Sequence, residues 1–228
     1  MSKLREPPSG ELREVRDVPE AFAELVATEF LAARTRREGR FSMAVSGGDT
    51  ARACYERLAM DSSIDWSSVD LFLGDERCVP ADDVAANQRL VRESLVVPTG
   101  GVARLTPMCC DDPAAYAATI ARLGEIDLVH LGLGPDGHTA SLFPGSAALE
   151  APGEALVLAS EDPTGRNPYP RMTLTLPAIA LGRLVVFTVA GPTKHGALER
   201  ILGGEDLPAA RVRAARVIWL CDRGAMQG

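Results

Sequence analysis

The chain has 228 residues, of which 46% are hydrophobic and 24% charged, so it can bury one sizeable core and lacks the polar composition of a disordered protein. The formal net charge of -7 argues against a broad basic surface for nucleic acid or anionic lipid. No apolar stretch approaches the roughly 20 residues needed to span a bilayer, and the N-terminal segment lacks the apolar core of a signal peptide. We therefore expect one cytoplasmic domain over residues 1–228, with the first dozen or so residues peripheral and with neither nucleic acid nor membrane as a partner.

The cysteines are few, scattered and odd in number, and they form no CxxC pair. They are Cys54, Cys78, Cys109, Cys110 and Cys221. This usage predicts free thiols in a reducing compartment, and the sequence shows no Cys/His cluster with the spacing of metal ligands. A thiol nucleophile at Cys78 is a remote alternative, because no histidine lies near it in sequence.

The first predicted element is an amphipathic helix over 18–38, which ends near Gly39. After it, short apolar runs without clean alternation predict strands buried on both faces. These runs cover 41–45, 69–73, 126–131, 155–159, 184–190 and 217–220. Helical segments are predicted between them, at 50–60, 87–95, 113–123 and 192–202.

Alternating strands and helices predict an α/β sandwich with a mostly parallel sheet, right-handed crossovers and helices on both faces. In such sheets ligands bind beyond the carboxyl ends of the strands. Four of the predicted strands lead directly into segments rich in glycine, hydroxyl groups and charge. They begin at Ser46, Gly74, Gly132 and Gly191.

The first of these segments is Ser46-Gly47-Gly48-Asp49-Thr50. Its glycines permit close approach of a ligand, and the amides of the following helix, together with the hydroxyls of Ser46 and Thr50, can cradle a phosphate. A tight turn with Thr50 as a helix cap explains the segment equally well. It is not a Walker loop, because no Gly-Lys-Ser/Thr follows.

The segment after 126–131 contains a carboxylate and an imidazole two residues apart. Its residues 132–137 fit the GxGxxG pattern, a weak dinucleotide signal here because Pro135 interrupts the loop. A loop can bring Asp136 against His138 and fix the tautomer of the imidazole, which is the arrangement of a general base. His130 lies inside a predicted strand, and we interpret it as structural.

Charged residues complete the set of candidate site residues. Asp75, Glu76 and Arg77 follow a buried strand, where charges must pair or bind something, so an internal salt-bridge cluster is the alternative to a site. Arg171 and Lys194 add cations on two further segments. With the glycine loop they indicate an anion clamp.

In order and spacing, these motifs resemble those of the glucosamine-6-phosphate isomerase/6-phosphogluconolactonase family. Within this family they are similar to the motifs of the lactonases. The resemblance runs from about residue 15 to the C-terminus. The blocks that carry it are 46–50, 74–77, Asn87, 132–145, 171–177 and 191–194.

The resemblance implies a modified Rossmann-like fold and hydrolysis of 6-phosphoglucono-δ-lactone in the oxidative pentose phosphate pathway, with no nicotinamide or metal. It implies that His138, oriented by Asp136, is the general base, and that Asp75 and Arg77 complete the pocket. It assigns substrate and phosphate binding to Ser46, Gly47, Gly48, Thr50, Asn87, Arg171 and Lys194.

The sequence departs from the family pattern at three places: Ala51 replaces a proline, Ala86 replaces a serine, and Arg166-Asn167 stands where a lysine is common.

The closest alternative is a glucosamine-6-phosphate deaminase, which would need Asp75 as a base and an acid after His138. A non-catalytic phosphosugar sensor and an NAD-dependent oxidoreductase are further alternatives. We expect a monomer or small homo-oligomer.

Overall fold

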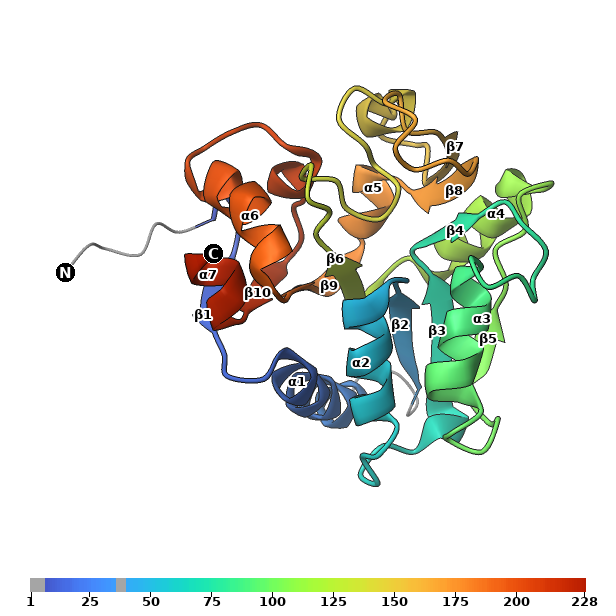
Figure 1. Ribbon diagram of the computed structural model, residues 1–228. Coiled ribbons are helices and arrows are strands. Elements are labelled where there is room, and N and C mark those ends of the chain that lie inside the picture. The colour runs from blue at the N-terminus through green and yellow to red at the C-terminus, as the bar shows by residue number, and fades with distance from the viewer. Residues whose placement is uncertain (1–6, 36–39) are drawn as a thin grey trace.

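The computed structural model describes residues 7–35 and 40–228, and a seven-stranded sheet forms the centre of this part of the chain (Figure 1). Every pair of neighbouring strands in this sheet runs parallel, which confirms the predicted α/β class. From one edge to the other, the strands are β1 (Glu11–Glu14), β10 (Arg216–Cys221), β9 (Gly182–Val189), β6 (Ile126–Gly132), β2 (Phe41–Val45), β3 (Val69–Leu73) and β5 (Arg104–Thr106).

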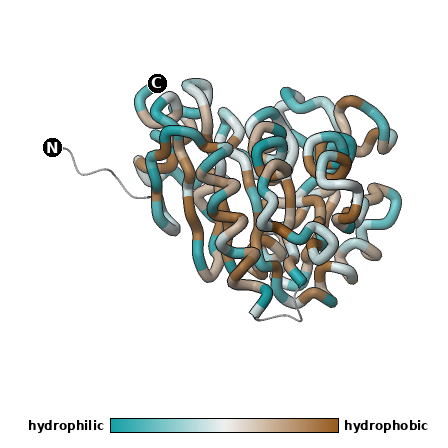
Figure 2. The backbone as a smooth tube through the Cα atoms, turned by 90° about the horizontal axis from the view of Figure 1, so that it is seen from below, coloured by the Kyte–Doolittle hydropathy of each residue, from teal (hydrophilic) through white to brown (hydrophobic). Residues whose placement is uncertain are grey.

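The inner strands are buried along nearly their whole length, as their continuous apolar runs predict. In Figure 2 the brown, hydrophobic stretches run through the middle of the molecule, and teal segments lie mostly at its periphery. One polar contact inside this core joins two neighbouring strands. Asp127 on β6 accepts hydrogen bonds from the backbone N–H and the hydroxyl of Ser42 on β2, at 3.0 and 2.9 Å.

Helices cover both faces of the sheet. Three pack side by side in chain order on one face, where α2 contacts both α1 and α3. The helix α4 connects β5 back to β6, so a right-handed crossover places it on the opposite face. The helices are α1 (Val18–Ala33), α2 (Asp49–Leu58), α3 (Asn87–Val91), α4 (Pro113–Leu123), α5 (Leu176–Ile179), α6 (His195–Leu202) and α7 (Arg223–Gln227).

Two predicted helices differ from the observed ones. The first helix starts at Val18, after an Asp17 cap, but ends at Ala33, and residues 36–39 of its predicted end lie outside the described residues. The predicted helix 87–95 is α3 followed by a turn of π-helix, Arg92–Val96. The other three predicted helices correspond to α2, α4 and, after the 3-10 turn η4 (Pro192–Lys194), α6.

A second, three-stranded antiparallel sheet was not predicted. It consists of β4 (Asp75–Arg77), β8 (Arg171–Leu174) and β7 (Val157–Ser160). The apolar run 155–159 therefore belongs to this small sheet and not to the parallel one. Its strands have three or four residues each, so they are too short for an alternation of apolar and polar residues to be recognised in the sequence.

The N-terminal segment also contributes a strand. Of the residues predicted to be peripheral, 1–6 lie outside the described residues, whereas β1 forms the edge of the main sheet and pairs with β10. Ser9 is tied to the same edge, because its carbonyl accepts a hydrogen bond from Trp219 Nε1 at 3.0 Å. In residues 7–35 and 40–228, no helix is long and apolar enough to cross a membrane.

The prediction that all five cysteines are free thiols is wrong. Cys78 and Cys110 form a disulfide, with their Cα atoms 5.7 Å apart. The two residues are 32 apart in sequence, and only the fold brings the end of β4 beside the loop that follows β5. The free thiols are Cys54 and Cys221, which are buried, and Cys109, which is exposed.

Candidate functional site

A pocket of about 190 Å³ lies at the carboxyl ends of the parallel strands. Its walls come from the loops that follow β2, β6 and β9, from β4 and β8 of the small sheet and from the start of α3. Asp136 does not line the pocket, but its carboxylate is hydrogen-bonded to the His138 ring. The structure thus brings the predicted residues together, and those in the wall are Ser46, Gly47, Gly48, Thr50, Asp75, Arg77, Asn87, His138, Arg171 and Lys194.

The loop between β2 and α2 presents the start of a helix to the pocket. The first amides of α2 have no acceptor within the helix, and the positive end of its dipole favours an anion there. Ser46 is committed elsewhere: its hydroxyl donates to the carbonyl of His130 and its backbone N–H donates to the hydroxyl of Tyr55, both at 2.7 Å. Ser46 therefore holds the loop in place, and Thr50 is the hydroxyl left to meet a ligand.

Asn87 links this loop to β4. Its side-chain amide donates to the carbonyl of Asp75 at 2.9 Å and to Asp75 Oδ1 at 3.1 Å. A Cβ atom at Gly47 would stand 1.9 Å from Asn87 Oδ1, so residue 47 must be glycine for the two segments to meet. Both residues shape the pocket as well as line it.

Asp75 is the centre of a buried polar network. Its Oδ2 accepts a hydrogen bond from the Ser141 hydroxyl at 2.6 Å and lies 3.7 Å from Arg171 Nη1. Only 5% of Asp75 and 6% of Arg171 is exposed. Burial lowers the pKa of Arg171 while Asp75 opposes that shift, so the carboxylate stabilises the guanidinium in this position.

Glu76 and Arg77 make contacts of a different kind. The carboxylate of Glu76 accepts hydrogen bonds from the backbone N–H groups of Arg77 and Asn87, each at 2.7 Å, and of Gln88 at 2.8 Å. Ala86, at the cap position of α3, offers no side-chain acceptor, so Glu76 caps this helix from another segment. Arg77 lines the pocket and donates from Nη1 to the carbonyl of Ala85 at 2.7 Å.

His138 and Asp136 form the predicted pair. His138 Nδ1 lies 2.5 Å from Asp136 Oδ1, and the backbone N–H of His138 donates to the same oxygen at 3.1 Å. Burial alone raises the pKa of Asp136, but the hydrogen bonds and charge of His138 outweigh it and lower that pKa, so the group stays a carboxylate. It accepts the proton of Nδ1, which leaves Nε2 unprotonated in the neutral ring.

The surroundings of His138 fix its ring. A Cβ at Gly134 would stand 2.1 Å from Nδ1, so only glycine lets the imidazole lie against the loop backbone. On another side the ring contacts Phe143, with the ring centres 4.8 Å apart. The guanidinium of Arg171 lies 5.4 Å from the centre of the same Phe143 ring. Phe143 thus packs against both the predicted base and a predicted cation.

Lys194 is a cation without a partner. Its ammonium makes no hydrogen bond or ion pair with any residue that the structure describes. Burial lowers its pKa, and Asp136 and Asp49 oppose that shift. An unpaired, half-buried ammonium in a pocket wall attracts an anionic ligand.

The histidine predicted to be structural lies in the core. His130 is fully buried, and its ring nitrogens lie 2.8 Å from the Tyr55 hydroxyl and 2.8 Å from Thr188 Oγ1. Burial lowers its pKa to about 3, so the ring stays neutral. Through Tyr55 it supports the Ser46 loop, and through Thr188 it reaches the pocket wall.

Several contributors were missed by reasoning from the sequence. Ser141 is not among the predicted site residues, yet it orients Asp75. Tyr55 and Thr188 look like ordinary residues of a helix and a strand, and nothing in their spacing reveals hydrogen bonds to segments more than fifty residues away. The GxGxxG pattern lies in a different setting from that of a dinucleotide site, because β6 leads into an irregular loop and not into a helix that could hold a pyrophosphate.

Side chains that could bind a metal ion do not gather into one site in the part of the chain that the structure describes. Within residues 7–35 and 40–228, no group of three or more His, Cys, Asp or Glu side chains is arranged to hold a metal ion.

Comparison with known proteins gives one answer. The family model described as glucosamine-6-phosphate isomerases/6-phosphogluconolactonase matches residues 14–219. A 6-phosphogluconolactonase of Synechocystis sp. is 34% identical over 207 residues, which cover 82% of this chain and 84% of the relative. One of Mycobacterium tuberculosis is 35% identical over 218 residues, with coverage of 86% and 87%.

Solved structures agree with the sequence comparison. The crystal structure of 6-phosphogluconolactonase from Thermotoga maritima superimposes with a TM-score of 0.81 at 29% identity, and covers 93% of this chain and 99% of its own. This chain belongs to the glucosamine-6-phosphate isomerase/6-phosphogluconolactonase family.

Proposed function

We propose that this protein hydrolyses 6-phosphoglucono-1,5-lactone to 6-phosphogluconate in the oxidative pentose phosphate pathway. The observation that carries the proposal is the His138–Asp136 pair, with its free Nε2, in one pocket with an unpaired ammonium and a helix N-terminus. Membership of the family, and relatives that are named 6-phosphogluconolactonases, support the same conclusion.

The substrate phosphate binds at the start of α2, where backbone amides and the Thr50 hydroxyl donate hydrogen bonds. Lys194 and Arg171 supply positive charge, and charge-assisted hydrogen bonds to phosphate are the strong kind. Arg77 is a third cation in the wall, close to either the phosphate or the lactone oxygen.

The chemistry needs a base and an acid in turn. His138 Nε2 takes a proton from a water molecule as its oxygen bonds to the lactone carbonyl carbon, and the carbonyl oxygen becomes an oxyanion. The tetrahedral intermediate collapses, the bond from that carbon to the ring oxygen breaks, and the imidazolium returns the proton to the ring oxygen. Asp136 stabilises the imidazolium between the two transfers.

The geometry weighs against deamination. A base that abstracts a proton from the sugar must have an oxygen available, whereas both oxygens of Asp75 are engaged with Asn87, Ser141 and Arg171. The position of Ser141, three residues after His138, carries a hydroxyl that donates to Asp75 and not an acid that could open a ring. Asp75 is therefore a positioning residue for Arg171.

The same proposal extends to the setting of the enzyme. The protein acts in the cytoplasm as a monomer or small homo-oligomer, binds no nucleic acid, and needs no metal or redox cofactor. Analytical ultracentrifugation and activity after treatment with a chelator test these points. A loss of activity with the chelator that added metal restores would contradict the cofactor-free mechanism.

The direct test is the rate at which purified protein consumes 6-phosphogluconolactone, corrected for the spontaneous opening of the lactone. The expected result is a rate proportional to enzyme concentration that His138→Asn nearly abolishes. Binding of the phosphosugar without any turnover would instead identify a sensor.

A further inference from the structure

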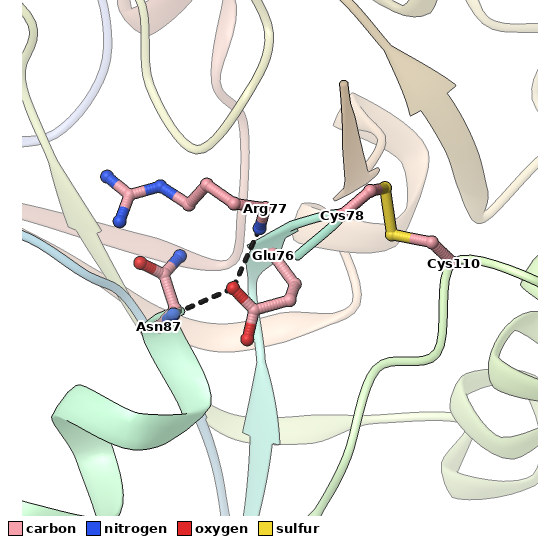
Figure 3. Close-up of a disulfide and its surroundings, with 5 residues drawn as sticks. All are labelled: Glu76, Arg77, Cys78, Asn87 and Cys110. Carbon is pink, nitrogen blue, oxygen red and sulfur yellow. Dashed lines mark hydrogen bonds between the residues drawn. A yellow bond between two sulfur atoms is a disulfide. The ribbon is translucent and has the colours of Figure 1, made fainter. Parts of the chain in front are cut away.

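The disulfide begins at the residue that directly follows Arg77, a residue of the pocket wall. Cys78 directly follows Arg77, and its backbone N–H donates to the carbonyl of Pro170 at 2.8 Å, which continues the pairing of β4 with β8. Cys110 lies in the loop between β5 and α4. Figure 3 shows the disulfide on one side of β4 and the Arg77 side chain directed away from it, on the side of Asn87. The bond thus ties a distant loop to the residue next to a pocket cation.

The five cysteines differ in how far solvent reaches their sulfur atoms. Cys78 and Cys110 are both partly exposed, and Cys109 beside them is exposed. Cys54 and Cys221 are buried, and burial raises the pKa of each thiol to about 12. Reagents that attack thiols or disulfides in the folded protein therefore reach the disulfide and Cys109, and not the two buried thiols.

We infer that Cys78 and Cys110 form a reversible thiol–disulfide exchange site through which a dithiol reductant changes the affinity of the pocket for its substrate. One thiolate of the reductant attacks a sulfur of the pair, forms a mixed disulfide and releases the other cysteine as a thiol. The second thiol of the reductant then displaces the remaining cysteine. Two electrons and two protons pass from the dithiol, which becomes a disulfide, to Cys78 and Cys110.

The link from the disulfide to the pocket runs through residues 78–86. Residues 78–85 of this segment are exposed or partly exposed, and Val84 is 85% exposed. The segment returns to the pocket at Ala85, whose carbonyl holds Arg77 Nη1, while Arg77 Nε is buried without a partner. The orientation of the guanidinium therefore depends on the shape of a loop whose first residue is clamped by the disulfide.

Other parts of the pocket have anchors of their own. Glu76 holds the start of α3 through backbone hydrogen bonds, and Asp136 holds His138 through a direct one. Neither anchor involves a cysteine. Reduction should therefore loosen the Arg77 side of the pocket and leave the general base in place, so KM should change more than kcat.

The first arm of the test counts reactive thiols on the folded protein and needs no substrate. Alkylation followed by mass spectrometry should label Cys109 alone before treatment with a dithiol, and Cys78, Cys109 and Cys110 after it. Removal of the reductant in air or with oxidised dithiol should restore the first pattern. Hydrogen exchange in the peptide that covers residues 77–87 should be faster in the reduced protein.

The second arm measures lactone hydrolysis in both states and rests on the proposed function. Reduction should raise KM by about fivefold or more, the low end of typical coupling between two sites, with a much smaller change in kcat. The double variant Cys78→Ser/Cys110→Ser should have the KM of the reduced protein, and this KM should not change when the reductant is added. The matched control Cys109→Ser should respond as the unaltered protein does.

Two results would overturn the inference: labelling of Cys78 and Cys110 without any reductant, or equal KM values and equal hydrogen exchange of residues 77–87 in both states. Absence of lactonase activity in both states would overturn the proposed function alone. In that case the hydrogen exchange of residues 77–87 and the affinity for inorganic phosphate decide whether the disulfide acts on the pocket.

Discussion

His138 has one ring nitrogen bonded to Asp136 and one left free for a water molecule. Replacement His138→Asn should lower kcat by about two to four orders of magnitude, the usual contribution of a general base, because no other imidazole lines the pocket wall. The affinity for 6-phosphogluconate, measured by calorimetry, should hardly change. The matched control His195→Asn alters a histidine of α6 that bonds to the Ala225 carbonyl outside the pocket, and should keep full activity.

Lys194 makes binding sensitive to alkaline pH. Its pKa is lowered by burial, so in the free protein the ammonium loses its proton at a lower pH than an exposed lysine would. The charge is present below this pKa and lost above it, so affinity for 6-phosphogluconate should fall as the pH rises through it. Calorimetry over a pH series measures this decline.

The variant Lys194→Met should weaken binding by about 1.5 to 3 kcal/mol, the range for a charge-assisted hydrogen bond, and should lack the alkaline decline. Arg223→Met removes an exposed cation of α7, outside the pocket wall, and serves as the control with the same change in net charge. Equal affinity of Lys194→Met and the unaltered protein would remove Lys194 from the site.

At the scale of elements, the carboxylate of Glu76 joins β4 to α3 through backbone hydrogen bonds. Glu76→Gln leaves a single oxygen to face three backbone N–H groups, so we expect a loss of about 1 to 3 kcal/mol in the free energy of unfolding. Urea denaturation measures it. Glu93→Gln changes an exposed glutamate in the turn after α3, and it should alter stability by much less. Equal stability of the two variants would mean that α3 does not need this cap.

The disulfide also crosslinks elements. It joins residues 32 apart, and for a loop of that length the chain-entropy account predicts a contribution of about 3 to 4 kcal/mol to the free energy of unfolding. Urea denaturation with and without a dithiol should show that the dithiol lowers the free energy of unfolding by up to this amount. Cys78→Ser/Cys110→Ser should show the loss in both conditions, and an unchanged midpoint on reduction would contradict the crosslink.

At the scale of the whole molecule, the parallel sheet and the position of the pocket follow from the sequence. Strands such as β2 and β6 are covered on both faces, and this demands uninterrupted apolar runs that can be recognised without a partner. The polar segments come directly after these runs, so the rule that ligands bind beyond the carboxyl ends of strands places them together. The pair formed by Asp136 and His138 is local, two residues apart, and is equally visible.

What the sequence could not predict are contacts between distant segments. The small sheet pairs Asp75 with Thr173, and the disulfide joins Cys78 to Cys110, and no period or spacing along the chain encodes either pairing. The hydroxyl of Ser46 looks like a phosphate ligand in the sequence. Only the packing of β2 beside β6 shows that its proton goes to the His130 carbonyl.

The central claim is that a phosphate clamp and an oriented histidine make this pocket a phosphosugar lactonase. The most direct measurement compares three substrates on one purified sample: 6-phosphogluconolactone, unphosphorylated gluconolactone and glucosamine 6-phosphate. We predict rapid hydrolysis of the first, far slower hydrolysis of the second because the remote phosphate positions the carbonyl, and no ammonia from the third. Equal use of both lactones, or ammonia release at a rate comparable to lactone hydrolysis, would contradict the account.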